Sequence, residues 1–176
     1  MKNRKDMISH RVQAIPASGI RKYFDLINSM DGVISLGVGE PDFVTPWHIS
    51  EAGIYAVEKG YTMYTSNYGI IELREEIARN LYQRHGIEYD PYTEILVTSG
   101  SSEALDLAMR AILDPEQEVI IADPSYVAYM PYAILSEGEI VPVPTFAENR
   151  FEVRPEDIAS RITGQTKALL LGYPNN

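Results

Sequence analysis

Short apolar runs alternate with segments of helical periodicity from residue 95 onward, and this alternation constrains the fold more than any other feature. The apolar runs predict four strands, over Ile95–Thr98, Val119–Ala122, Ile140–Val143 and Ala168–Leu171. The segments between them predict helices at about 101–113, 125–136 and 155–162. Strands and helices that alternate with short connections form a mostly parallel sheet, with right-handed crossovers and helices on its faces. We therefore predict an α/β fold.

The composition of these segments predicts how deeply they are buried. The runs EVIIA (118–122) and KALLLG (167–172) are apolar at successive positions, as in strands that are covered on both faces. The predicted helix at 101–113 is apolar all round except for Glu103, Asp106 and Arg110, so it too is expected to be largely buried. The last strand ends five residues before Asn176, and we expect the sheet to be incomplete.

Helix signals also mark the first half of the chain. Ser18 is a candidate cap for a helix over residues 19–30. Thr45 followed by Pro46 predicts a helix that runs to Lys59 and stops at Gly60. Apolar residues at helical spacing predict another helix over 70–85, which ends near Gly86.

The charge and the composition exclude several classes of function. A formal net charge of −10 argues against nucleic acid or an anionic membrane as a partner. The chain has no cysteine, and its three histidines, His10, His48 and His85, show no metal-ligand spacing. No apolar run is long enough to span a bilayer, and the basic start lacks the apolar segment of a signal peptide. We expect a cytoplasmic protein without a metal.

The turn Ser99-Gly100-Ser101-Ser102 leads from a predicted strand directly into a predicted helix. Free N–H groups at a helix N-terminus attract anions, and Gly100 allows a ligand to approach the backbone. Ser101 and Ser102 add two hydroxyl donors. The structural alternative is that the serines only cap the helix. No Walker A or GxGxxG pattern follows the strand, so neither of those phosphate sites is predicted.

Tyr126 follows the next predicted strand, in the segment Asp123-Pro124-Ser125-Tyr126. Ligands of open α/β sheets bind outside the carboxyl ends of the strands, so Tyr126 is expected at the same edge as the serines. An aromatic face beside a phosphate site suits a flat heteroaromatic cofactor. The alternative is a core or interface tyrosine, which is common in a chain with 12 tyrosines.

Five stretches, in order along the chain, resemble the class I aminotransferases of pyridoxal-phosphate (PLP) fold type I, the subgroup with aspartate, alanine and aromatic aminotransferases. They are ISLGVGEPDFVTP (34–46), YTMYTSNYGIIELREEIA (61–78), VTSGSSEALDLAMRAIL (97–113), DPSYVAY (123–129) and GYPNN (172–176). The resemblance implies the three-layer α/β/α fold of these enzymes. It further implies an N-terminal arm and small-domain segment over residues 1–45, and the first part of the large PLP-binding domain over 46–176.

The resemblance implies a role for each matching residue. Gly100, Ser101 and Ser102 resemble the cradle of the PLP phosphate, and Tyr126 resembles the aromatic residue that stacks on the pyridine ring. Tyr64 resembles the tyrosine that reaches the cofactor phosphate of the neighbouring subunit, which implies a homodimer. Asn176 resembles the asparagine that binds the ring hydroxyl oxygen and helps to hold the substrate carboxylate. Gly39 resembles the loop glycine whose backbone faces that carboxylate. The structural alternatives are a surface Tyr64, a Gly39 that serves only the turn before Pro41, and an Asn176 that is only a terminus.

Three residues that such an enzyme needs are expected after the last motif: the aldimine lysine, an aspartate at the pyridinium nitrogen and an arginine for the substrate carboxylate. The five lysines present are Lys2, Lys5, Lys22, Lys59 and Lys167, and none stands in the family's aldimine setting. The resemblance therefore implies no catalytic residue in this chain, which is expected to be inactive alone.

The implied reaction moves an amino group from an L-amino acid to a 2-oxo acid, by a ping-pong route through pyridoxamine phosphate. Aspartate with 2-oxoglutarate is the nominal substrate pair, and aromatic amino acids and alanine remain open. A PLP lyase or synthase of the same fold is an alternative, although the run GVGEPDF…TP favours the aminotransferase. A non-catalytic PLP-fold regulator is disfavoured because no helix-turn-helix domain precedes the fold. A complete binding protein conflicts with the incomplete sheet.

Overall fold

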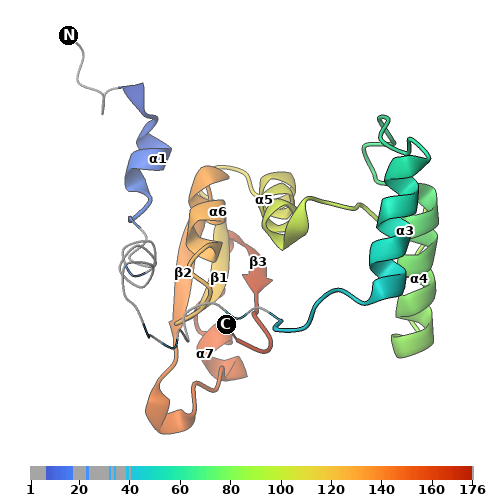
Figure 1. The fold of residues 1–176 in the computed structure, drawn as a ribbon. Helices are drawn as coiled ribbons and strands as arrows, with labels where there is room; N and C mark the ends of the chain where they lie inside the picture. Colours follow the sequence, from blue (N-terminus) through green and yellow to red (C-terminus); the bar gives the residue numbers. More distant parts are fainter. Residues whose placement is uncertain are drawn as a thin grey trace. The chain divides into compact units, whose positions relative to one another are not determined.

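The computed structural model describes residues 7–17, 23, 32, 34, 39 and 41–175. The chain forms two compact units, one of residues 1–18 and 99–176 and the other of residues 19–98 (Figure 1). The predicted cap at Ser18 lies outside the described residues, as does the helix over 19–30 except for Tyr23. Among the described residues, none of the helices combines the length and the apolar character that a membrane span requires.

Two helices are described in the unit of residues 19–98, α3 (Trp47–Glu58) and α4 (Ile71–His85). Both were predicted, and both end at the expected glycines, because Gly60 and Gly86 adopt left-handed φ angles of +75° and +67°. The predicted cap at Thr45 is wrong. The N-cap of α3 is Pro46, and no side chain makes a capping hydrogen bond there.

The other unit holds a three-stranded parallel sheet with the strand order β2-β1-β3. Its strands are β1 (Glu118–Asp123), β2 (Glu139–Pro144) and β3 (Thr166–Leu170). Its helices are α1 (His10–Ala14), α5 (Gly100–Ile112), α6 (Tyr129–Leu135), the 3-10 turn η2 (Ala147–Asn149) and α7 (Pro155–Ala159). The parallel α/β arrangement and three of the four predicted strands are therefore confirmed.

The fourth predicted strand, Ile95–Thr98, is not a strand in the structure. The segment is extended, and one backbone bond holds it, from the N–H of Val97 to the carbonyl of Tyr68 at 3.0 Å. A strand needs a neighbour that pairs with it residue by residue. No described segment pairs with residues 95–98 in this way, so the apolar pattern predicted an extended backbone correctly but not a sheet.

The core lies between one face of the sheet and the helices α5 and α6. Met109 and Leu113 pack against Val119 and Ile121 of the central strand. Side chains alternate along a strand, so Ile120 points to the opposite face, where it is only 1% exposed. The central strand β1 is therefore covered on both faces, as its apolar run predicted.

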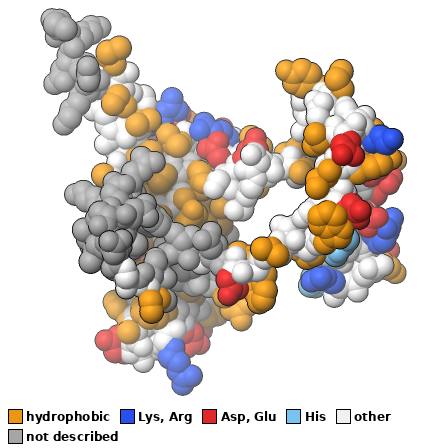
Figure 2. All heavy atoms as spheres, in the orientation of Figure 1, with side chains coloured by type: hydrophobic (Ala, Val, Ile, Leu, Met, Phe, Trp, Pro, Cys, Tyr) orange, Lys and Arg blue, Asp and Glu red, His pale blue; other side chains and the backbone are white. Residues whose placement is uncertain are grey.

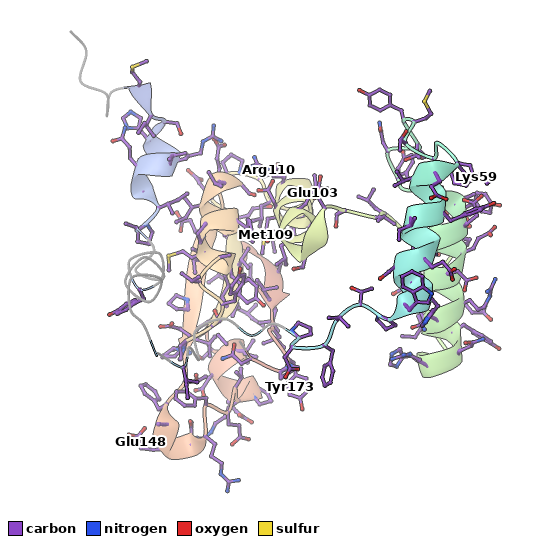
Figure 3. The ribbon with its side chains drawn as sticks, in the orientation of Figure 1. Lys59, Glu103, Met109, Arg110, Glu148 and Tyr173 are labelled. Atoms are coloured by element: carbon purple, nitrogen blue, oxygen red, sulfur yellow. The ribbon has the colours of Figure 1, made fainter. Side chains whose placement is uncertain are left out.

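Burial was overestimated for β3 and for α5. Leu169 of β3 is 45% exposed, because β3 lies at the edge of the described sheet and one of its faces is open. Met109 points from α5 toward the strands, whereas Glu103 and Arg110 lie on exposed sides of the helix (Figure 3). Within the described residues, α5 packs against α6 and the sheet along one side only. Most of the apolar side chains on its other sides are therefore exposed.

Candidate functional site

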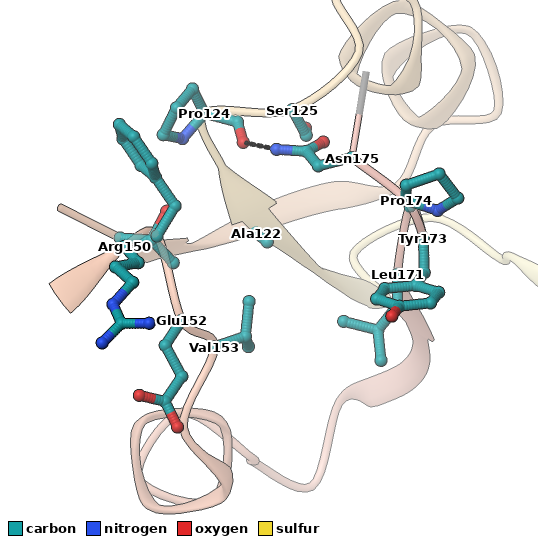
Figure 4. A pocket seen from close by; sticks show the side chains of 13 residues that line it. Ala122, Pro124, Ser125, Arg150, Glu152, Val153, Leu171, Tyr173, Pro174 and Asn175 are labelled. Atoms are coloured by element: carbon teal, nitrogen blue, oxygen red, sulfur yellow. Dashed lines mark hydrogen bonds between the residues drawn. The ribbon is translucent and has the colours of Figure 1, made fainter. Parts of the chain in front are cut away.

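The carboxyl ends of the three strands meet at one edge of the sheet, because all strands are parallel. A cavity of about 740 Å³ opens at this edge (Figure 4). It is lined by residues that follow the strand ends, namely Ala122, Pro124, Ser125, Thr145, Arg150, Phe151, Glu152, Val153, Leu171, Gly172, Tyr173, Pro174 and Asn175. The cavity lies at the edge formed by the strand ends, but its lining includes none of the predicted residues Gly100, Ser101, Ser102 and Tyr126.

Two side chains tie the loops at this edge together. Thr145, which follows β2 and is 7% exposed, donates to the carbonyl of Asp123 from its N–H at 2.7 Å and from its hydroxyl at 3.0 Å. Asn175, which follows β3, donates from Nδ2 to the carbonyl of Pro124 at 3.0 Å (Figure 4). The end of the central strand is thus held from both neighbouring strands.

Tyr126 lies in the turn between β1 and α6, where the predicted helix over 125–136 begins four residues later than expected. The ring is half-buried and meets the ring of Tyr129 edge to face, with centroids 5.5 Å apart and an angle of 82° between the planes. The N–H of Tyr129 also donates to the carbonyl of Tyr126 at 3.1 Å. Tyr129 itself packs against the core, so the ring of Tyr126 contacts a residue that the core holds in place.

The serine turn forms the N-terminus of α5, a helix of 13 residues. The N-cap residue Ser99 makes no side-chain capping bond, and its N–H instead donates to the carboxylate of Glu103. Gly100 has a φ of +81°, and a Cβ added there would meet no atom within 4 Å. Ser101 and Ser102 are exposed, and no hydrogen bond of their hydroxyl groups is found within the described part of the chain. The structural alternative, that these serines cap the helix, is not what the geometry shows.

The other predicted site residues lie in other parts of the chain. Gly39 and Tyr64 belong to the other compact unit, where both are exposed. Asn176 lies outside the described residues, as do Lys2, Lys5 and Lys22. Lys167 lies near the amino end of β3, at the opposite edge of the sheet, and Lys59 follows α3.

Sequence reasoning missed three residues that shape the site. Asn175 stands in the quoted stretch GYPNN, and its position beside Asn176 could have identified it. Tyr129 stands three residues after Tyr126, a spacing that allows two rings to meet across one turn. Thr145 gave no signal, because a single threonine after an apolar run has no distinctive pattern.

The donor set favours an anionic, planar ligand over a metal ion. The N-terminus of α5 offers backbone N–H and hydroxyl groups, and a helix N-terminus attracts negative charge. The aromatic ring of Tyr126 lies separately, in the turn before α6. Clusters of three or more histidine, aspartate and glutamate side chains with metal-binding geometry are not found among the described residues. A phosphate attached to a flat ring fits the hydroxyl-rich turn and the tyrosine.

The similarity of this chain to known proteins extends over nearly its whole length. The sequence model described as "Aminotransferase class I and II" matches residues 31–176. A protein named aromatic-amino-acid aminotransferase 2 from Thermococcus litoralis is 41% identical over 169 residues, and an aspartate aminotransferase from Pyrococcus abyssi is 43% identical over 169 residues. Each match covers 96% of this chain but only 43% of the relative, so the chain spans less than half the length of these curated relatives.

Solved structures show the same likeness. The crystal structure of an aspartate aminotransferase from Thermotoga maritima superimposes with a TM-score of 0.88 at 38% identity. The match covers 96% of this chain and 46% of that chain. The present chain therefore shares the fold of this aminotransferase over its own length.

Proposed function

The chain belongs to the class I and II aminotransferase family, and on this premise we propose that the protein transfers amino groups with pyridoxal phosphate as its cofactor. The intact protein moves an amino group from an L-amino acid to a 2-oxo acid. One observation carries the proposal: the N-terminus of α5 presents a glycine with a left-handed φ and two exposed serines whose hydroxyl groups do not cap the helix. Such a turn provides donors for a phosphate.

The residues present fit this cofactor. Gly100 adopts a left-handed φ and leaves open space where a side chain would lie, so a phosphate oxygen can approach the backbone. Ser101 and Ser102 donate to the phosphate, and the dipole of α5 stabilises its charge. Tyr126 offers its ring for stacking on the pyridine. When bound, pyridoxal phosphate supplies an aldehyde that exchanges with the amino group and a ring that withdraws electrons from the substrate.

Further roles are assigned by family resemblance. Asn176 binds the ring hydroxyl oxygen and the substrate carboxylate, and the backbone of Gly39 faces the same carboxylate. Tyr64 crosses to the cofactor phosphate of a second subunit in a homodimer. Tyr64 is exposed, and Figure 2 shows further apolar side chains on the surface of the unit that holds α3 and α4. Exposed large apolar residues of this unit include Phe43, Val44, Trp47, Tyr61 and Met63.

The lysine that binds the cofactor covalently is assigned to a part of the family fold that this chain does not cover. Of the two described lysines, Lys59 follows α3 in the other compact unit, and Lys167 lies near the amino end of β3, opposite the strand ends that carry the candidate site. We therefore propose that residues 1–176 alone do not transaminate. We also propose the domain division at residues 45 and 46, and a cytoplasmic location.

Aspartate with 2-oxoglutarate stays the nominal substrate pair. The relatives carry aspartate and aromatic names at similar identity, 43% and 41%, so aromatic amino acids are a close second candidate. Alanine and a PLP lyase of the same fold are further alternatives. The substrate is decided by assay rather than by the residues of this chain.

The test uses the full-length gene product, purified with pyridoxal phosphate. We expect a visible absorption band from the bound cofactor, and transamination of L-aspartate with 2-oxoglutarate, measured beside tyrosine, phenylalanine and alanine as donors. A Ser101→Ala/Ser102→Ala variant should bind the cofactor about tenfold or more weakly, because two hydrogen bonds to a charged group are lost. A full-length protein that binds no pyridoxal phosphate would overturn the proposal.

A control variant and a second test variant separate loss of cofactor binding from loss of folding. Ser160→Ala changes an exposed serine whose hydroxyl donates to the carbonyl of Asp157 in α7, far along the chain from the serine turn. It should leave cofactor affinity unchanged. Tyr64→Phe should weaken cofactor retention more than it lowers the melting temperature, because it removes one phosphate donor from an exposed side chain. Equal affinity in Tyr64→Phe and wild type would remove the role assigned to Tyr64.

A further inference from the structure

A side-chain hydrogen bond joins the loops that follow β1 and β3. Asn175 donates from Nδ2 to the carbonyl of Pro124 at 3.0 Å, across 51 positions of sequence (Figure 4). Pro124 stands two residues before Tyr126. The bond therefore holds the loop segment from which the tyrosine ring projects.

A second contact joins the same two loops. A Cβ added at Gly172 would lie 3.1 Å from the hydroxyl oxygen of Tyr129, so the loop after β3 passes close to that tyrosine. Tyr129 is the residue whose ring meets Tyr126 edge to face. The turn 124–129 is thus contacted by residues 172 and 175 at both of its ends.

We propose that Asn175 is a positioning residue, which keeps the ring of Tyr126 in the plane needed to stack on the cofactor. This inference rests on the proposed function. The bond is exposed and neutral, so its contribution to global stability is small. A stacked ring, however, tolerates little displacement, and a shift of about 1 Å in a positioning element weakens a site strongly. Loss of the Asn175 hydrogen bond is therefore expected to weaken cofactor binding more than it lowers global stability.

Asparagine suits this role because its short side chain carries an N–H donor. Leucine has a similar size but no donor, and aspartate has the same shape but only acceptors. Glutamine keeps the donor on a side chain that is one methylene longer. These three substitutions separate the hydrogen bond from side-chain volume.

The experiment uses the full-length protein loaded with pyridoxal phosphate, as wild type, Asn175→Leu, Asn175→Asp and Asn175→Gln. Two readouts are taken: the dissociation constant of the cofactor, and the visible circular dichroism of the bound cofactor, which reports its asymmetric surroundings. We expect Asn175→Leu and Asn175→Asp to bind about fivefold more weakly with a reduced dichroic band. Asn175→Gln should stay closer to wild type than either.

Asn149→Leu is the matched control. The Oδ1 of Asn149 accepts from the N–H of Phe146 at 3.4 Å, so the variant also removes a bond between a loop asparagine and the backbone. It should leave the affinity and the dichroic band unchanged. An equal loss in Asn149→Leu would overturn the inference, because the effect would then be a general one on the unit.

A double-mutant cycle tests whether Asn175 acts through Tyr126. Tyr126→Leu removes the stacking ring, so adding Asn175→Leu to it should weaken cofactor binding by less than twofold further. Additive losses would show that Asn175 acts through another contact, and would overturn the inference. If wild type binds no cofactor, the proposed function fails. If wild type binds and Asn175→Leu binds equally well, only the role of Asn175 fails.

Discussion

At the scale of single residues, the chain contains a buried arginine that contacts a turn of the backbone. Arg74 of α4 is 6% exposed, and its Nη1 donates to the carbonyls of Pro91 at 2.8 Å and Tyr92 at 3.3 Å. The face of Tyr68 lies 5.9 Å from the guanidinium carbon. The turn 90–94 is therefore held on α4 by a charged donor and not by apolar packing alone.

We predict that Arg74→Leu lowers the free energy of unfolding of the full-length protein by about 2–3 kcal/mol, because two part-buried hydrogen bonds from a charged donor to backbone carbonyls are lost. Chemical denaturation measures the change. Arg79→Ala is the control, since Arg79 pairs with Glu76 on the exposed side of the same helix and its loss should cost less than about 0.5 kcal/mol. Equal losses in both variants would show that Arg74 is no more than a surface residue.

Asp90 makes the same turn sensitive to acid. The hydroxyl of Thr93 and the N–H of Tyr92 donate to its carboxylate at 2.7 and 2.9 Å, and these bonds, with the charge of Arg74, lower the pKa of Asp90. A lowered pKa in the folded state means that the stabilisation is complete above the ordinary pKa of the group. It is lost as the pH falls through the lowered value.

We predict that wild type loses more stability than Asp90→Asn between about pH 5 and pH 2, and that the two proteins run parallel between about pH 6 and pH 8. Denaturant midpoints across this range, compared for the two proteins, measure the difference. Curves that stay parallel at acid pH would mean that Asp90 does not carry the effect.

At the scale of elements, apolar periodicity predicted what the chain forms locally and failed where a neighbour decides the outcome. The strands β1, β2 and β3 and the helices α3, α4 and α5 were predicted within a few residues. The segment 95–98 has the same apolar pattern as the strands, but no described strand pairs with it. Likewise Leu169 is apolar and exposed, because burial depends on what covers a face and not on the residue itself.

The candidate site, like the elements, could be predicted only in part from the sequence. The serine turn and Tyr126 were recognisable, because each follows a strand end and each is a residue type with a clear chemical use. Asn175 and Thr145 were not predicted, since both act by contacting the carbonyl of a residue remote in sequence. Such contacts depend on the strand order, which local pattern does not specify.

Gly69 lies two residues before α4 and close to Val97, in the segment that precedes the serine turn. Its φ is +94°, and an added Cβ would lie 2.7 Å from the Cβ of Val97. We predict that Gly69→Ala costs about 2 kcal/mol or more, because both the backbone conformation and the contact become strained. Thermal unfolding of the full-length protein measures the loss.

Gly53→Ala is its control. Gly53 lies inside α3, and an added Cβ there meets no atom within 4 Å, so this variant should gain about 0.5–1 kcal/mol. If Gly69→Ala were equally stabilising, the close approach of Gly69 to Val97 would not exist in solution.

At the scale of the whole molecule, the described sheet has a free edge on each side. β2 and β3 each pair only with β1, and Leu169 adds exposed apolar surface on β3. Unpaired strand edges form hydrogen bonds with other chains. We predict that the polypeptide of residues 1–176, expressed alone, self-associates, and that Leu169→Lys reduces the association. Light scattering after size exclusion measures both. A monodisperse monomer that unfolds cooperatively would contradict this prediction.

The strand order β2-β1-β3 has a consequence for where a ligand can enter. The chain adds β2 on one side of β1 and then returns to add β3 on the other side, so the direction of winding reverses at β1. Right-handed crossovers then carry the connection after β1 to one face of the sheet and the connection after β2 to the opposite face. At such a topological switch point the two connections diverge, so the path of the backbone alone forms a crevice. Loop residues can therefore differ between proteins with this winding while the crevice stays at the same edge of the sheet.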